Sequence, residues 1–118
     1  MRWSVCILFL VFLAGLQGQA PAKSLPELKA FFAANCVKCH GTDGSAHTPE
    51  RKKLGGFDFT DATAAAKESD ADMVKTIRKG IFFGITMPSF KENLSEKDTQ
   101  LLVQEVLRKA EKGKVIAP

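Results

Sequence analysis

Two cysteines and a histidine stand within five positions of this chain, in the stretch NCVKCHG at residues 35–41. Cys36, Cys39 and His40 can hold a zinc ion, run thiol–disulfide exchange, or attach a haem covalently. Each of these chemistries requires different surroundings, so the rest of the chain decides between them. The cluster therefore constrains the fold more than any other feature of the sequence.

The start of the chain has the pattern of a targeting segment. Arg2 is followed by an apolar run over residues 5–16, VCILFLVFLAGL, and residues 18–20 offer small side chains where a signal peptidase cleaves. As a helix this run spans only about 18 Å at 1.5 Å per residue, short of the roughly 30 Å hydrocarbon core. We therefore predict a cleaved secretory signal over residues 1–20 and one domain over residues 21–118, with an uncleaved anchor as the alternative.

The mature chain predicted in this way has few means of stabilising a small core. It keeps only Cys36 and Cys39, and all of its aromatic residues are phenylalanine. A domain of this size buries a modest core and often needs an additional stabilising element. A disulfide between two such close cysteines closes too small a loop to constrain the unfolded chain. We therefore expect a large non-protein group to fill part of the core.

The charge of the chain is mild and dispersed. The net charge is +4, and it becomes +3 without Arg2, the only charged residue of the predicted signal. The basic residues are interspersed with Asp and Glu, whereas a nucleic-acid site needs a denser basic stripe with interleaved aromatic residues. We therefore expect no nucleic-acid binding. Exposed lysines such as Lys38 keep the surface soluble or form a docking face for an acidic protein partner.

Local signals predict three main helices and no convincing strand. The first begins after Ser24 and leads into Cys36, the second covers residues 70–80, and the third begins after Ser95 with Gly113 as its stop. The predicted fold class is therefore all-α, with long loops between the helices.

Two of these loops are unusual. Residues 41–62 are polar and contain several glycines, without a helical or strand period. Loops this long are uncommon in a compact domain unless they pack on something. Residues 81–90, IFFGITMPSF, are apolar but are interrupted by Gly84 and Pro88, so we expect a loop there too.

Haem attachment agrees with all of these features. Two thiols at positions i and i+3 can add to the two vinyl groups of one porphyrin, and the adjacent histidine then lies beneath the iron. Cys36 and Cys39 would form the thioethers, and His40 would be the proximal ligand. The attachment is made outside the cytoplasm, in agreement with the predicted signal, and the ring would fill the core that the chain lacks.

A second axial ligand is expected downstream, on a loop. Methionine is suitable, because its thioether binds haem iron and raises the reduction potential. Met87 lies in a loop interrupted by glycine and proline, which can turn the side chain toward the iron, and we predict it as the distal ligand. Met73 lies on the apolar side of the second helix, which favours a core role, and His47 follows His40 too closely. An open coordination position is the remaining alternative.

Zinc binding and thiol exchange have less support. Zinc could use the two cysteines with His40 and His47, but an adjacent cysteine and histidine rarely converge on one tetrahedral ion. The second half of the usual paired spacing is also missing. A thioredoxin-like pair needs a βαβ unit, of which the sequence shows no sign. A structural disulfide would leave the histidine, Met87 and the long loops unexplained.

The sequence resembles the class I c-type cytochromes, small electron carriers of bacteria and mitochondria, over about residues 25–112. The resemblance rests on Phe32 with NCVKCHG at residues 35–41, on GITMPSF at residues 84–90, and on the closing run LSEKDTQLLVQEVLRK. This closing run is similar to the last helix of bacterial members related to the cytochrome c subunits of cytochrome oxidase. The resemblance implies three main helices and long loops around one covalently bound haem c, with the N- and C-terminal helices packed crosswise.

The chain departs from the family pattern in two respects. Leu28 stands where family members usually carry glycine, and the last helix lacks the aromatic residue that packs over that position. We expect these two departures to compensate each other in the packing, because a larger residue on one helix can offset a smaller one on the other. The family also has a proline whose carbonyl accepts the N–H of the proximal histidine, and Pro49 is the candidate for this role.

A haem with both axial positions filled does not readily bind oxygen or peroxide, and it passes single electrons. We therefore predict a periplasmic electron carrier with protein redox partners and no enzymatic activity. The alternatives are a fixed subunit of a membrane oxidase or dehydrogenase and, if Met87 is labile, a haem-based ligand sensor. Contact with a membrane is expected only through a redox complex or an uncleaved N-terminus.

Overall fold

The first helix begins where the sequence predicts. In the computed structural model, which describes residues 21–118, α1 (Leu25–Asn35) starts after Ser24 with a reciprocal capping box. The Ser24 hydroxyl accepts a hydrogen bond from the Glu27 amide at 3.3 Å, and the Glu27 carboxylate accepts one from the Ser24 amide at 2.6 Å. These contacts satisfy two backbone donors at the helix start. The predicted secretory signal over residues 1–20 lies outside the described residues.

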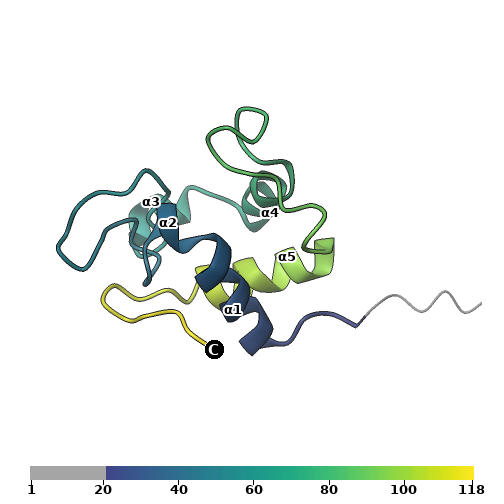
Figure 1. The fold of residues 1–118 in the computed structure, drawn as a ribbon, viewed down its shortest axis with the longest axis horizontal. Coiled ribbons are helices and arrows are strands. Elements are labelled where there is room, and N and C mark those ends of the chain that lie inside the picture. The colour runs from purple at the N-terminus through teal and green to yellow at the C-terminus, as the bar shows by residue number, and fades with distance from the viewer. Residues whose placement is uncertain (1–20) are drawn as a thin grey trace, which may run out of the picture.

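The part of the chain that the structure describes is helical, as predicted, and contains no β-strand. The helical segments that follow α1 are α2 (Val37–His40), α3 (Ala62–Ala66), α4 (Asp70–Lys79), α5 (Glu96–Leu102) and the π-helix η1 (Val103–Leu107). Figure 1 shows α1 and α5 crossing, with α2 and α3 to one side and α4 above α5. The short helices α2 and α3 are not predicted by the sequence patterns. Among the described residues, no helix combines the length and the apolar character that crossing a bilayer requires.

The third main helix changes its winding in its second half. α5 continues directly into η1, where the Arg108 amide donates to the Val103 carbonyl at 2.9 Å. A backbone bond that reaches back five residues defines a π-helical turn, which is a rare form. The helix ends at Leu107, so the expectation that Gly113 stops it is wrong. Gly113 belongs to a later turn, because its amide donates to the Asp43 carboxylate at 2.7 Å.

The core lies between α1 and the closing helix formed by α5 and η1. α1 contacts both segments, and Figure 1 shows it crossing the closing helix steeply, as the family resemblance implies. Leu28 and Phe32 on α1 are 1% and 0% exposed, and Val103 on the closing helix is 0% exposed. The three side chains belong to one buried cluster. Leu28, a large residue on α1, thus packs in a cluster to which the closing helix contributes only aliphatic side chains. This agrees with the expectation that a larger residue on one helix offsets smaller residues on the other.

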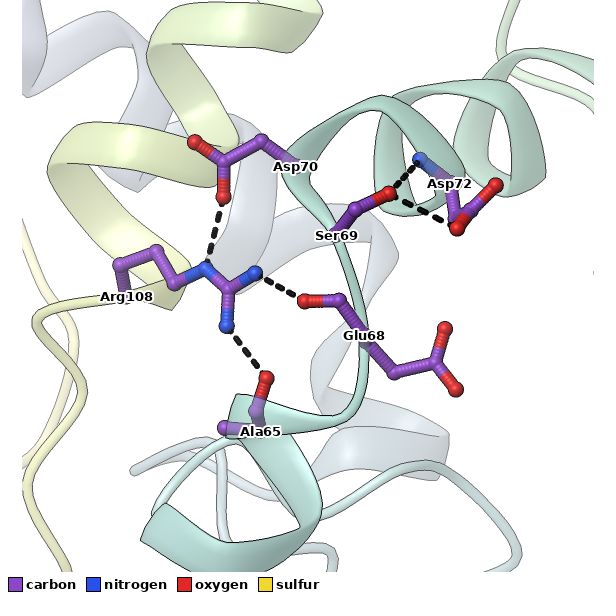
Figure 2. Close-up of polar contacts among 6 residues, drawn as sticks. All are labelled: Ala65, Glu68, Ser69, Asp70, Asp72 and Arg108. Carbon is purple, nitrogen blue, oxygen red and sulfur yellow. Dashed lines mark hydrogen bonds and ion pairs between the residues drawn. The ribbon is translucent and has the colours of Figure 1, made fainter.

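Arg108 ties the end of η1 to the connection between α3 and α4 (Figure 2). Its Nε donates to Asp70 Oδ1 at 2.8 Å, its Nη1 donates to the Ala65 carbonyl at 2.6 Å, and its Nη2 donates to the Glu68 carbonyl. The Ser69 hydroxyl caps the start of α4 beside these contacts. Because a guanidinium presents its donors in one rigid plane, these three bonds fix the connection relative to the closing helix.

Leu28→Ala should lower the free energy of unfolding by about 2–5 kcal/mol, because the shortened side chain leaves a cavity in the buried cluster. Leu28→Gly should lower it by a further ~1 kcal/mol, because glycine weakens the helix. Urea denaturation followed by circular dichroism measures both changes. Leu25→Ala, at a position of the same helix that is 41% exposed, is the control and should cost less. A neutral or stabilising effect of Leu28→Gly would contradict the expected compensation in the packing.

Candidate functional site

One turn of helix presents the cysteine cluster. Cys36 ends α1, where its amide donates to the Phe32 carbonyl at 2.9 Å, and α2 carries Cys39 and His40. The amides of Cys39 and His40 both donate to the Cys36 carbonyl, at 3.2 and 2.9 Å. Residues three positions apart are neighbours on a helical surface, and both cysteines line the same cavity.

This cavity has a volume of about 420 Å³ and a mostly apolar wall. Cys36, Cys39 and His40 line it from one segment, and Met87 lines it from another. Apolar side chains from the loops and helices complete the wall: Phe57, Phe59, Ile77, Phe90 and Leu107. Cofactor sites are commonly apolar cavities of roughly 300–1,000 Å³ with a few convergent polar groups. The structure therefore brings the four predicted haem residues to one cavity whose character suits a large apolar group.

A backbone carbonyl orients the ring of His40. Nδ1 of His40 lies 3.0 Å from the carbonyl oxygen of Phe57, and the Phe59 ring packs against the imidazole with their centroids 5.0 Å apart. Because a carbonyl only accepts, Nδ1 must carry the proton of the neutral ring, which leaves the lone pair on Nε2. This is the tautomer in which a histidine binds a metal through Nε2.

Phe57 takes the role expected for Pro49, so that expectation is wrong. Pro49 is exposed and does not line the cavity. It belongs to a turn that closes on itself, because the Thr48 amide donates to the Lys52 carbonyl at 2.9 Å. The chain returns to the histidine only after this turn, at Gly56 and Phe57.

Gly56 allows the returning chain to approach the cluster closely. Its amide donates to the Cys39 carbonyl at 2.9 Å. A Cβ at this position would lie 2.7 Å from His40 Nδ1 and closer still to the carbonyl oxygen of Cys39, so only glycine fits. A Cβ at the neighbouring Gly55 would meet nothing. The glycine pair followed by two nearby phenylalanines is the sequence signal that could have identified this contact.

Two of the three candidate distal ligands reach the cavity. Met87 is held at the wall by two bonds to Ile81, whose amide donates to the Met87 carbonyl at 3.0 Å and whose carbonyl accepts from the Met87 amide at 3.4 Å. Met73 also lines the cavity, but it is buried in the core cluster. His47 does not line the cavity, and its Nδ1 lies 2.7 Å from the Ser45 carbonyl.

The geometry does not support a zinc site or a redox-active pair of thiols. Among residues 21–118, no group of three or more His, Cys, Asp or Glu side chains is placed to hold a metal ion. Burial, together with the charge of nearby Cys39, raises the pKa of the Cys36 thiol to about 12. A thiol this weakly acidic is a poor nucleophile and a poor source of thiolate. A thioether to a porphyrin is uncharged and suits the apolar wall.

Known proteins of similar sequence are also cytochromes, in agreement with covalent haem attachment. The family model described as "Cytochrome C oxidase, cbb3-type, subunit III" matches residues 23–104. Cytochrome c6 of Synechocystis sp. is 34% identical to this chain over 108 residues, which cover 92% of this chain and 84% of that protein.

Solved structures extend the likeness to the fold. The c-type cytochrome KustC0563 is 31% identical with a TM-score of 0.57, over 71% of this chain and 96% of that chain. A point mutant of the same cytochrome gives a TM-score of 0.56 at 31% identity, over 71% of this chain and 98% of that chain. Because the sequence match extends over most of this chain and the structural match over nearly all of its neighbour, the protein is a member of the c-type cytochrome family, whose members bind haem c covalently and transfer electrons.

Proposed function

We propose that this protein is a periplasmic carrier of single electrons, with one haem c attached through Cys36 and Cys39 and ligated by His40 and Met87. The observation that carries the proposal is that these four side chains, from two separate segments, line one apolar cavity. The likeness to cytochrome c6 over most of both chains supports electron carriage. The signal pattern at residues 1–20 supports export.

When bound, the haem supplies an iron that changes between Fe(II) and Fe(III) by one electron. Cys36 and Cys39 hold the group at two points next to His40. The Phe57 carbonyl keeps the proton on Nδ1 of the histidine, which fixes the ring orientation and strengthens Nε2 as a ligand. The mostly apolar wall lowers the polarity around the group, which is one of the factors that set a haem potential.

Met87 is preferred to Met73 as the distal ligand because of how each is held. Met87 lies on a loop whose two sides are joined through Ile81, so the backbone positions it at the cavity wall. Met73 is packed on α4 with Ile77 in the buried cluster. Turning Met73 toward an iron would remove its side chain from that packing.

Met87→Ala should abolish the weak far-red sulfur-to-iron absorption of the oxidised protein and lower its reduction potential. The reduced variant should also bind carbon monoxide, because one axial position becomes open. Met73→Leu, a change of similar volume, should leave all three properties unchanged. Optical spectra and redox titrations of the purified proteins measure them. A far-red band that survives in Met87→Ala would show that the ligand assignment is wrong.

Gly56→Ala should raise the reduction potential, because the added methyl group pushes the returning chain away from His40 and weakens its bond to Phe57. A histidine without this acceptor donates less charge to the iron and stabilises Fe(III) less. Gly55→Ala, where a Cβ would meet nothing within 4 Å, is the matched control and should leave the potential unchanged. Equal potentials in the two variants would mean that the Phe57 carbonyl does not tune the histidine.

A fixed subunit of a membrane oxidase is the second candidate, and the description of the family model favours it. Cell fractionation after a high-salt wash distinguishes a free carrier from a fixed subunit. A free carrier should be recovered in the periplasmic fraction with its N-terminus near residue 21 by mass spectrometry, and this is the outcome we expect. A fixed subunit would remain with a membrane complex. Carbon monoxide binding by the unmodified protein at neutral pH would instead favour a ligand sensor.

A further inference from the structure

Three apolar side chains project from the loop that carries Met87. Phe82, Phe83 and Ile85 are 74%, 103% and 85% exposed. Figure 1 shows the connection between α4 and α5 rising from the body of the protein as a loop. Side chains left in water contribute nothing to the core, and exposed apolar patches commonly mark an interaction site. The tip, defined as residues 82–85, therefore needs an explanation other than folding.

The tip is a defined turn and not a loose segment. The bridge between Ile81 and Met87 closes its base, and the Ile85 amide donates to the Phe82 carbonyl at 3.0 Å. Phe82 and Phe83 both have a φ of 54°, in the left-handed region that residues other than glycine rarely adopt. The chain thus keeps two consecutive aromatic residues exposed in spite of a conformational cost.

The segment around the tip carries the whole charge excess of the chain. Residues 73–91 contain no Asp or Glu and four basic residues: Lys75, Arg78, Lys79 and Lys91. The chain has 17 Lys and Arg against 13 Asp and Glu, so removing these four leaves the rest balanced at 13 of each. The three lysines are exposed, and none of the ion pairs found in the described part of the chain involves them.

We propose that the tip inserts into the surface of a membrane containing anionic lipid, with Lys75, Lys79 and Lys91 facing the headgroups. A projecting apolar turn needs a matching pocket on a protein, whereas the boundary of the acyl chains accepts apolar side chains of any shape. The uncompensated lysines add attraction to an anionic surface over about a Debye length. This contact goes beyond the expected routes to a membrane, which were a redox complex or an uncleaved N-terminus.

Such a contact would hold one side of the cavity at the membrane surface. Met87 stands at the base of the tip and lines the cavity. If the protein is the electron carrier proposed above, on which this consequence rests, its search for a membrane-bound partner takes place along a surface. The binding itself does not depend on the ligands of the iron, so it can be tested separately.

The test uses mature holoprotein, with the loss of residues 1–20 verified by mass spectrometry, and vesicles of phosphatidylcholine with or without phosphatidylglycerol. Flotation should recover the protein with the anionic vesicles at low salt, and the bound fraction should fall as salt is added. Phe83→Ser should weaken binding by about tenfold or more, because a large apolar side chain is lost from the lipid. Lys79→Gln should weaken it by about fivefold.

Two exposed positions away from the tip provide matched controls. Val115→Ser removes an exposed apolar side chain and Lys52→Gln removes an exposed cation, and both should bind like the unmodified protein. The haem spectrum verifies that each variant is folded, and Ile85→Ser replaces Phe83→Ser if the latter does not fold.

Absence of binding to anionic vesicles would overturn the proposal, as would equal binding by Phe83→Ser and Val115→Ser. A dimer in sedimentation velocity that Phe83→Ser dissociates, without vesicle binding, would also overturn it and make a second copy of the chain the occupant of the tip. Loss of vesicle binding with an intact far-red band would refute only the membrane contact and leave the electron-carrier proposal standing.

Discussion

The contact between the returning chain at Gly56 and Phe57 and the turn that carries Cys39 and His40 organises the site. Two hydrogen bonds make it: the Gly56 amide donates to the Cys39 carbonyl at 2.9 Å, and His40 Nδ1 lies 3.0 Å from the Phe57 carbonyl. The contact turns a long loop into one wall of the cavity and selects the tautomer of the histidine. The imidazole takes its orientation from this contact, while other backbone bonds, such as that from the Leu54 amide to the Ala46 carbonyl at 2.7 Å, hold the rest of the loop over residues 41–62.

The core and the site form one packing unit. Cys36 ends the helix whose Phe32 is fully buried, so the packing of α1 against the closing helix also positions the first cysteine. Leu107 and Met73 belong to the buried cluster and line the cavity as well. Because protein interiors are close-packed, a change of volume in the helix crossing is transmitted to the wall of the cavity.

The sequence patterns correctly predicted those features that depend on residues close together in the chain. The serine caps of the first and third main helices, Ser24 and Ser95, lie where they were expected, since a cap depends on one turn of chain. The cavity residues were named because their types and spacing carry the chemistry. The partner of His40 was missed, because Phe57 is 17 positions away and the path of the whole loop decides between it and Pro49. The end of the third helix was also missed, because Gly113 contacts Asp43, 70 positions away, and does not end the helix.

Arg108 binds two of its three partners through groups that every residue possesses. Ala65 and Glu68 contribute only their backbone carbonyls, and Asp70 alone contributes a side chain. The identities of the residues at positions 65 and 68 are therefore free to drift among descendants of this sequence without loosening the contact. Arginine itself has no such freedom, because the compact ammonium of lysine cannot reproduce a planar fork directed at three acceptors. Selection should consequently act on positions 70 and 108 here, while positions 65 and 68 diverge.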